Sequence, residues 1–139
     1  MPWHSYPYTP QFNRRGSMDF SYRPIVQIQV FAGTDTRIIP GLVDSGTEIS
    51  MISAEIAESL RIDSRKCKKA IAGGVGGDKP AFVSKVTFVV EGFDKPITSN
   101  VLFVEDLLFP ALLGQDDFFR NFDVRFEKRV NSFYLKAAA

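Results

Sequence analysis

The chain has 139 residues, enough for one domain with its own core but too few for two independent lobes. Apolar residues make up 45% of it and 13 residues are Phe, which excludes disorder and favours a packed, soluble, globular body. The 17 basic residues nearly balance the 16 acidic ones, so charge gives no reason to expect nucleic acid or a membrane surface as a partner.

Histidine and cysteine each occur once, as His4 and Cys67. A zinc site or a His-dependent triad within one chain would lack its ligands and its base. We therefore expect no metal and no cofactor, and carboxylates must be the reactive groups in any catalysis. The lone thiol cannot form an internal disulfide, which leaves the compartment open with a slight preference for the cytoplasm. No apolar stretch approaches the roughly 20 residues that cross a bilayer, and no signal peptide is recognisable.

Residues 1–20 are rich in proline and aromatic residues and show no sustained period. We expect an extended arm outside the core, either a disordered tail or a strap whose aromatic residues dock onto the body. The folded domain is expected to span residues 21–136. The final residues, 137–139, are three alanines typical of a cloning remnant and are left out of the fold prediction.

Alternating apolar residues predict a strand from Ile25 to Phe31, and a turn at Gly33 leads into a second strand, Thr36 to Val43. The second strand of this hairpin is followed directly by Asp44-Ser45-Gly46-Thr47. A carboxylate placed there sits at the end of a strand, in a tight glycine turn with hydroxyl groups beside it. On its own, however, Asp-Ser-Gly is an ordinary turn.

A short helix is predicted from Ser53 to Leu60, with Ser53 as its N-cap. The basic segment that follows, residues 61–69, is expected to be a solvated face. Residues 71–77 then read Ile-Ala-Gly-Gly-Val-Gly-Gly before a strand at residues 81–90. So many glycines suit a mobile hairpin, or flap, with Val75 at its tip; a merely flexible loop is the alternative. A phosphate loop fits poorly, because no Gly-Lys-Ser/Thr follows and Pro80 begins a β-rich run.

Further strands are predicted at residues 97–104, 109–113, 122–126 and 132–135, with no repeat of solenoid period. A short helix at residues 115–120 follows Gly114. Its early acids, Asp116 and Asp117, are expected to be surface charges that compensate the helix dipole. The prediction is an all-β fold with one or two short helices.

The order of these signals resembles the retropepsin-like aspartic proteases over about residues 25–135. The resemblance implies a closed acid-protease barrel with Asp44 as the catalytic residue. Ser45 would bond across a dimer, Gly46 would offer its backbone to the substrate, and Thr47 would line the cleft or bond the carboxylate. The implied substrate-binding flap comprises Ile71, Gly73, Gly74, Val75, Gly76 and Gly77. Leu113 and Gly114 would pack behind the catalytic turn.

One departure from the family concerns the residue after that glycine. Several members have a basic residue there, which pairs with an acid four positions beyond the catalytic Asp. Here the two positions hold Gln115 and Glu48, so the ion pair is reduced to at most a hydrogen bond. The length of the N-terminal arm also means that terminal strand exchange of the retroviral kind cannot be assumed.

An aspartic protease needs two carboxylates that share one proton, because like charges about 3 Å apart cannot both ionise. The chain has one Asp-Ser/Thr-Gly turn, which predicts a homodimer with two Asp44 side chains on a two-fold axis. The expected function is an aspartic endopeptidase acting on extended peptide or protein substrates. The alternatives are a catalytically silent, dimeric peptide-binding or scaffold module, and a protease inhibited by its own residues 1–20.

Overall fold

The computed structural model describes residues 2–12, 20–73 and 77–139. The strands are β1 His4–Pro7, β2 Thr9–Phe12, β3 Phe20–Arg23, β4 Ile25–Ala32, β5 Asp35–Val43, β6 Met51–Ser53, β7 Lys68–Ala72, β8 Lys79–Val90, β9 Ile97–Val104, β10 Ala111–Leu113, β11 Phe122–Glu127 and β12 Ser132–Ala137. Helix α1 is Ala54–Ser59, and shorter helical turns are η1 Ser64–Lys66, η2 Gln115–Phe119 and η3 Lys128–Val130. The prediction of a mostly β chain with short helices is confirmed.

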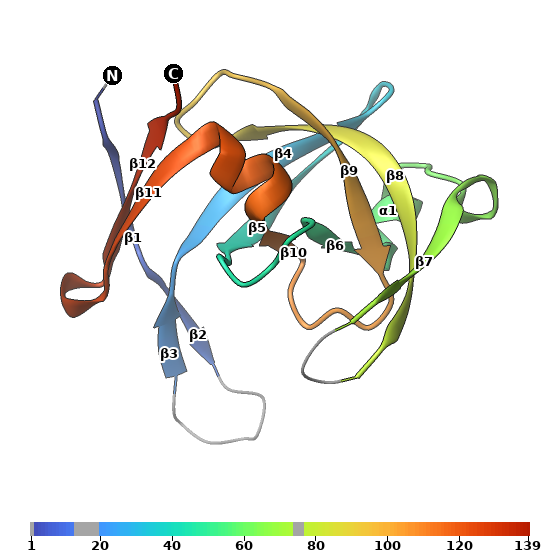
Figure 1. The fold of residues 1–139 in the computed structure, drawn as a ribbon, viewed down its shortest axis with the longest axis horizontal. Coiled ribbons are helices and arrows are strands. Elements are labelled where there is room, and N and C mark those ends of the chain that lie inside the picture. The colour runs from blue at the N-terminus through green and yellow to red at the C-terminus, as the bar shows by residue number, and fades with distance from the viewer. Residues whose placement is uncertain (1, 13–19, 74–76) are drawn as a thin grey trace.

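The main sheet closes into a barrel (Figure 1). Its strand order is β4-β5-β10-β6-β9-β8-β7, and an additional pairing of β4 with β8 joins the two sides. Most neighbours are antiparallel, as hairpin connections require, but β10 pairs with β5 and β6 pairs with β9 in parallel. The parallel pairing of β10 with β5 places Leu113 beside Val43 at the end of β5, and Asp44 follows directly.

The barrel interior is filled by the inward-facing residues of alternating strands. In β4, Ile28 and Val30 are buried, and the register sets them opposite Val90 and Phe88 of β8, which are buried too. Phe103 of β9 is fully buried and stacks on Phe82 at 5.4 Å between ring centroids. Period-two burial of this kind is what the alternating sequence of residues 25–31 predicted.

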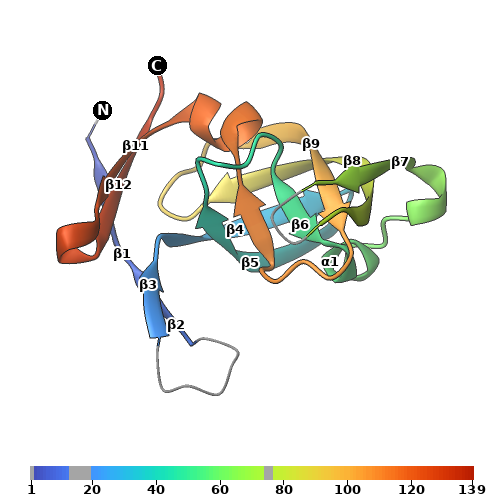
Figure 2. The same ribbon diagram turned by 60° about the horizontal axis from the view of Figure 1, so that its bottom comes forward.

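A second sheet, which we call the terminal sheet, consists of β1, β12 and β11 in that order. Both termini lie beside it (Figure 2). The arm expected outside the core therefore belongs in part to the fold, since β1 pairs with β12 and both Tyr6 and Tyr8 are core residues. His4 stacks on Phe93 at 4.2 Å between ring centroids. Where residues 2–12 are concerned, the strap interpretation fits and the disordered tail is wrong.

The helices differ from expectation in two details. Ser53 stands at the N-cap of α1, but its side chain makes no capping hydrogen bond. In η2, Asp116 is exposed as expected, whereas Asp117 is 2% exposed and was wrongly assigned to the surface. The turn is a π-helix, so its residues are spaced differently from those of the α-helix that the sequence suggested. Asp117 consequently points into the core.

Candidate active site

The loop from Asp44 to Ser50 leaves β5 at the middle of the face seen in Figure 1. The Asp44 carboxylate accepts two hydrogen bonds from its own turn, one from the Gly46 N–H to Oδ1 at 3.0 Å and one from the Thr47 hydroxyl to Oδ2 at 2.9 Å. The Thr47 N–H also donates to the Asp44 carbonyl at 3.2 Å. Both carboxylate oxygens are thereby fixed in direction.

The predicted turn residues therefore take distinct places. Thr47 is buried and bonds the carboxylate edge, one of the two roles expected for it. The Gly46 N–H donates to Asp44 Oδ1. Ser45 is exposed, and within the described part of the chain its hydroxyl has no hydrogen-bond partner. The turn thus presents one carboxylate and one free hydroxyl to the surroundings.

Leu113 and Gly114 lie directly behind the turn. The Asp44 N–H donates to the Leu113 carbonyl at 3.0 Å, which extends the parallel pairing of β5 with β10 by one bond. A Cβ on Gly114 would lie 2.5 Å from the Thr47 carbonyl oxygen and 3.0 Å from that of Glu48. Glycine is therefore required there because a side chain has no space. Backbone conformation is not the reason, since φ −114° and ψ −169° lie in the extended region that any residue adopts.

Two residues that the sequence analysis did not assign to the site hold the far side of the turn. The Ser50 hydroxyl accepts a hydrogen bond from the Gly114 N–H at 2.9 Å and donates to Asp117 Oδ1 at 2.5 Å. The Phe118 N–H donates to the same oxygen at 2.6 Å. The residues come from the end of the turn and from η2, more than sixty positions apart. In the sequence, the only signal for Ser50 and Asp117 is that they follow shortly after Asp44 and Gly114.

Burial raises the pKa of the Asp117 carboxyl above its ordinary value, and the hydrogen bonds from Ser50 and Phe118 only partly offset this effect. Its second oxygen, Oδ2, is buried without a hydrogen-bond partner among the described residues. The Asp117 side chain therefore has the character of a structural carboxyl that resists ionisation.

In the described part of the chain the Gln115 side chain makes no hydrogen bond to the Glu48 side chain. The Gln115 side-chain amide instead donates to the Ser45 carbonyl at 2.7 Å, and its N–H donates to the Thr47 carbonyl at 2.8 Å. The Asp116 N–H donates to the Glu48 carbonyl at 2.9 Å. The reason is geometric: the backbone of η2 approaches the turn so closely that backbone acceptors are within reach. The neutral amide thus supports the turn by a route other than an ion pair.

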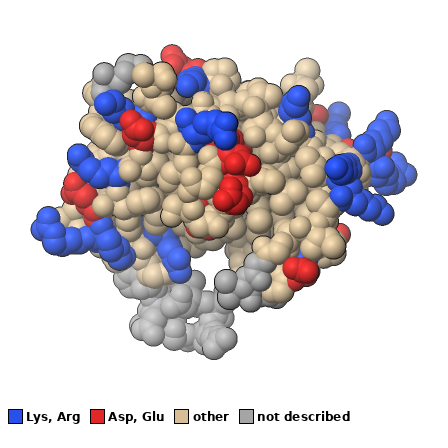
Figure 3. Space-filling view, in the orientation of Figure 1, with Lys and Arg blue, Asp and Glu red and all other residues tan. Residues whose placement is uncertain are grey.

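The predicted flap is a hairpin of β7 and β8. Ile71 is 70% exposed at the end of β7, and Gly77 has a φ of +95°, a value that favours glycine. Gly73 is also exposed, while the predicted tip residues Gly74, Val75 and Gly76 lie outside the described residues. The base of this hairpin begins in the basic segment, whose Lys and Arg side chains gather at the right-hand edge of Figure 3, away from the catalytic turn.

The described residues contain no group of three or more His, Cys, Asp and Glu side chains placed to hold a metal ion. Nor does any helix in that part of the chain combine the length and apolarity that a membrane span requires.

Comparison with known proteins identifies the fold. No protein-family model matches the chain, and no curated protein does either. Among solved structures, a retropepsin-like aspartic protease from Rickettsia conorii is similar over 97% of this chain and 99% of its own, with a TM-score of 0.61 and 22% identity. EIAV protease in complex with the inhibitor HBY-793 matches 76% of this chain and 88% of its own, with a TM-score of 0.54 and 25% identity.

A third similar structure is the retroviral protease-like domain of Ddi1 from Leishmania major. The match covers 83% of this chain and 94% of that domain, with a TM-score of 0.50 and 17% identity. At these identities the comparisons establish the architecture, and the chemistry must be argued from the residues of the turn.

Proposed function

On a chain that has the retropepsin-like fold, we propose that two copies assemble into an aspartic endopeptidase whose active site is shared between their Asp44 residues. The observation that carries the proposal is the geometry of the turn: a strand-end carboxylate with both oxygens hydrogen-bonded, braced from behind by the close approach of Gly114. One chain supplies only one such carboxylate, and acid–base hydrolysis of a peptide requires two.

In the proposed dimer the two Asp44 carboxyl groups share one proton, since like charges at hydrogen-bonding distance cannot both ionise. The ionised group takes a proton from a water molecule as general base, and the oxygen of that water attacks the peptide carbonyl carbon. The protonated group donates its hydrogen to the carbonyl oxygen. The two apparent pKa values belong to the pair and not to either chain. The exposed Ser45 hydroxyl is free to bond across the two-fold axis.

The substrate that suits this arrangement is an extended peptide. The hairpin of β7 and β8 would cover it and exclude bulk water, and strand-like pairing to the flap would supply main-chain hydrogen bonds. Ile71, at 70% exposure, and Leu108, also 70% exposed, offer apolar contacts for substrate side chains. The competing function is a catalytically silent peptide-binding module with the same fold. Self-inhibition by residues 1–20 finds less support, because β1 is part of the terminal sheet.

The test is cleavage of a denatured protein by wild type, Asp44→Asn and Asp94→Asn from acid to neutral pH. Asp94 is an exposed carboxylate in the loop between β8 and β9, so its substitution controls for the loss of one charge. We expect Asp44→Asn to lose at least about a hundredfold in rate and the control to lose nothing. Equal cleavage by all three would refute the assignment of Asp44. Absence of cleavage by a folded, dimeric wild type would establish the silent module.

A further inference from the structure

Strand β7 lies at one end of the main sheet. Among the described residues it pairs with β8 alone, and its other edge has no strand partner. The barrel closes through the pairing of β4 with β8, so the closure does not cover β7. An open strand edge is a template on which another extended chain can form backbone hydrogen bonds.

The backbone groups that face the open edge follow from the pairing of β8. The Glu105 N–H, directly after β9, donates to the Pro80 carbonyl at 3.1 Å, so the backbone of Pro80 faces β9. Facing direction alternates along a strand, so the next residue of β8 faces β7, and its partner Ala70 faces β8 in return. The N–H and C=O groups of Lys69 and Ile71, on either side of Ala70, therefore point to the open edge.

The chain beside this edge is strongly basic. Residues 61–69 carry five basic side chains and one acidic side chain, a net charge of +4 in a chain whose total is +1. The acid, Asp63, already accepts hydrogen bonds from the Arg65 guanidinium at 3.1 and 3.2 Å. Three exposed side chains make no hydrogen bond or salt bridge within the described part of the chain: Lys66, Lys68 and Lys69. A surplus of positive charge therefore remains at the start of β7.

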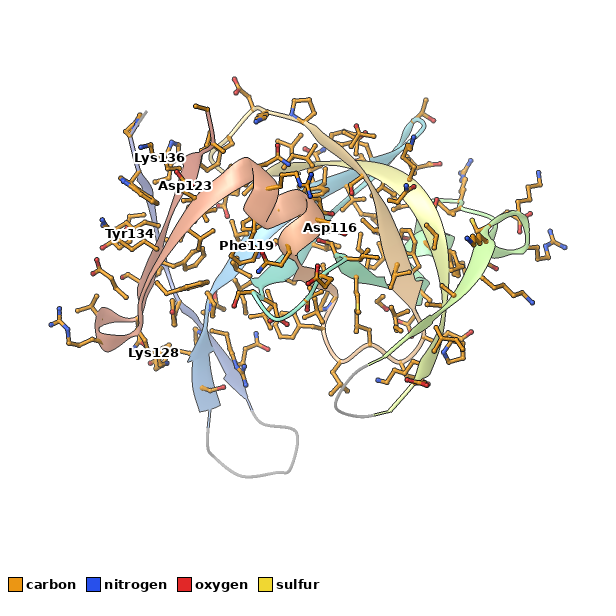
Figure 4. The ribbon with its side chains drawn as sticks, in the orientation of Figure 1. Asp116, Phe119, Asp123, Lys128, Tyr134 and Lys136 are labelled. Atoms are coloured by element: carbon orange, nitrogen blue, oxygen red, sulfur yellow. The ribbon has the colours of Figure 1, made fainter. Side chains whose placement is uncertain are left out.

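The basic side chains at the other end of the molecule differ from these. Figure 4 labels Lys128 and Lys136 beside the terminal sheet. The Lys128 Nζ lies 5.2 Å from the ring centroid of Tyr8 and donates to the Tyr22 carbonyl at 3.2 Å, and the Lys136 Nζ lies 5.7 Å from the ring centroid of Trp3. The basic side chains over η1 and β7 instead gather at the right-hand edge of Figure 3. Cations beside the terminal sheet are thus engaged within the chain, and those beside β7 remain free for a partner.

The lysines of β7 decide which strand its edge accepts. Like charges on facing positions destabilise a sheet and opposite charges stabilise it, so a second basic strand is disfavoured and a strand with carboxylates is favoured. Successive side chains lie on opposite faces of a strand, so Lys68 and Lys69 together select acids at neighbouring positions.

We propose that the open edge of β7 binds an extended acidic segment of another polypeptide as an additional strand, with carboxylates of that segment beside Lys68 and Lys69. Main-chain hydrogen bonds to Lys69 and Ile71 supply the pairing, and the lysines supply the preference for acidic sequences. Such binding needs neither cleavage nor a second copy of this chain, so the inference goes beyond the proposed function.

The test measures the fluorescence anisotropy of a fluorescein-labelled peptide as long as β7 whose central residues are glutamates. All proteins carry Asp44→Asn, which prevents cleavage at the proposed active site. Lys68→Glu with Lys69→Glu turns two attractions into two repulsions and should raise the dissociation constant at least about tenfold. The matched control is Lys95→Glu with Arg129→Glu, an equal change of charge on exposed residues of the β8–β9 loop and η3, and it should bind as the parent does.

Ile71→Pro tests the strand pairing itself. The Ile71 N–H points to the open edge, so proline removes a donor to the added strand and no hydrogen bond to β8. We expect a rise of at least about tenfold in the dissociation constant, with an unchanged circular dichroism spectrum. Ile71→Thr keeps the N–H and should bind normally. Unchanged peptide binding by folded Ile71→Pro would overturn the added strand.

The other outcomes separate the possible partners. Equal losses in the two double reversals would show that net charge alone attracts the peptide and would overturn the β7 site. A single-stranded oligonucleotide or a phosphatidylserine vesicle that binds more tightly than the peptide, and is lost in Lys68→Glu with Lys69→Glu, would assign the basic surface to phosphate groups instead. Absence of peptide binding at low salt, where surface attraction is screened least, would refute the proposal and leave the shared Asp44 site untouched.

Discussion

Replacement of Gly114 by alanine tests how the Asp44 turn is held. The added Cβ would lie 2.5 Å from the Thr47 carbonyl oxygen, and carbon–oxygen contacts need about 3.3 Å. The turn and η2 must therefore separate by roughly 0.8 Å. Overpacking of this kind costs about 1–3 kcal/mol. Two hydrogen bonds weaken as well, from the Gln115 N–H to Thr47 and from the Asp116 N–H to Glu48, at about 1 kcal/mol each.

The sum is a loss of about 3–5 kcal/mol in the free energy of unfolding. Urea unfolding followed by circular dichroism measures it directly. Gly73→Ala is the matched control for stability, because its Cβ would meet nothing closer than 3.5 Å, an ordinary contact, and we expect a change within about 0.5 kcal/mol. A loss below about 1 kcal/mol in Gly114→Ala would refute the close-approach argument, since the backbone would have relaxed without breaking either bond.

Two further predictions concern buried titratable groups. Because the pKa of Asp117 is raised in the folded chain, its contribution to stability should be complete below about pH 4 and fall as pH rises through the folded-state value. Asp117→Asn should flatten that part of the pH profile of unfolding free energy, and an unchanged profile would contradict it. The Tyr6 hydroxyl donates to the Glu91 carbonyl at 2.5 Å, and burial raises the pKa of Tyr6 to about 12. Tyr6→Phe should cost about 1 kcal/mol at neutral pH and should remove the loss of stability that wild type shows between pH 10 and 12, as urea titrations at both pH values would reveal.

The turn around Asp44 could be predicted because its signal is local. A strand that alternates up to Val43, a glycine two residues after the acid and small hydroxyl residues beside it are all properties of ten consecutive positions. The barrel strands were predictable for the same reason, since period-two burial appears directly in residues 25–31. The support behind the turn was partly predictable, because Gly114 follows an apolar run.

The rest depends on tertiary contacts that no local pattern encodes. Tyr6 is buried by tertiary contacts, among them Phe133 of β12 at 5.1 Å between ring centroids. Asp117 was taken for a surface acid because acids in a first helical turn usually are, but the π-helical turn rotates it into the core. Gln115 could not be assigned its Ser45 partner without the distance between η2 and the turn.

The parallel pairing of β5 with β10 has a consequence for the order of folding. The Asp44 N–H donates to the carbonyl of Leu113, almost seventy residues later in the chain, and parallel pairs cannot form as hairpins. Contacts of such sequence separation form late, because the loop between them must be closed first. A growing chain released before β10 would hold a complete Asp-Ser-Gly-Thr sequence but no rigid carboxylate. The fixed Asp44 carboxylate is therefore among the last features that the folding chain acquires.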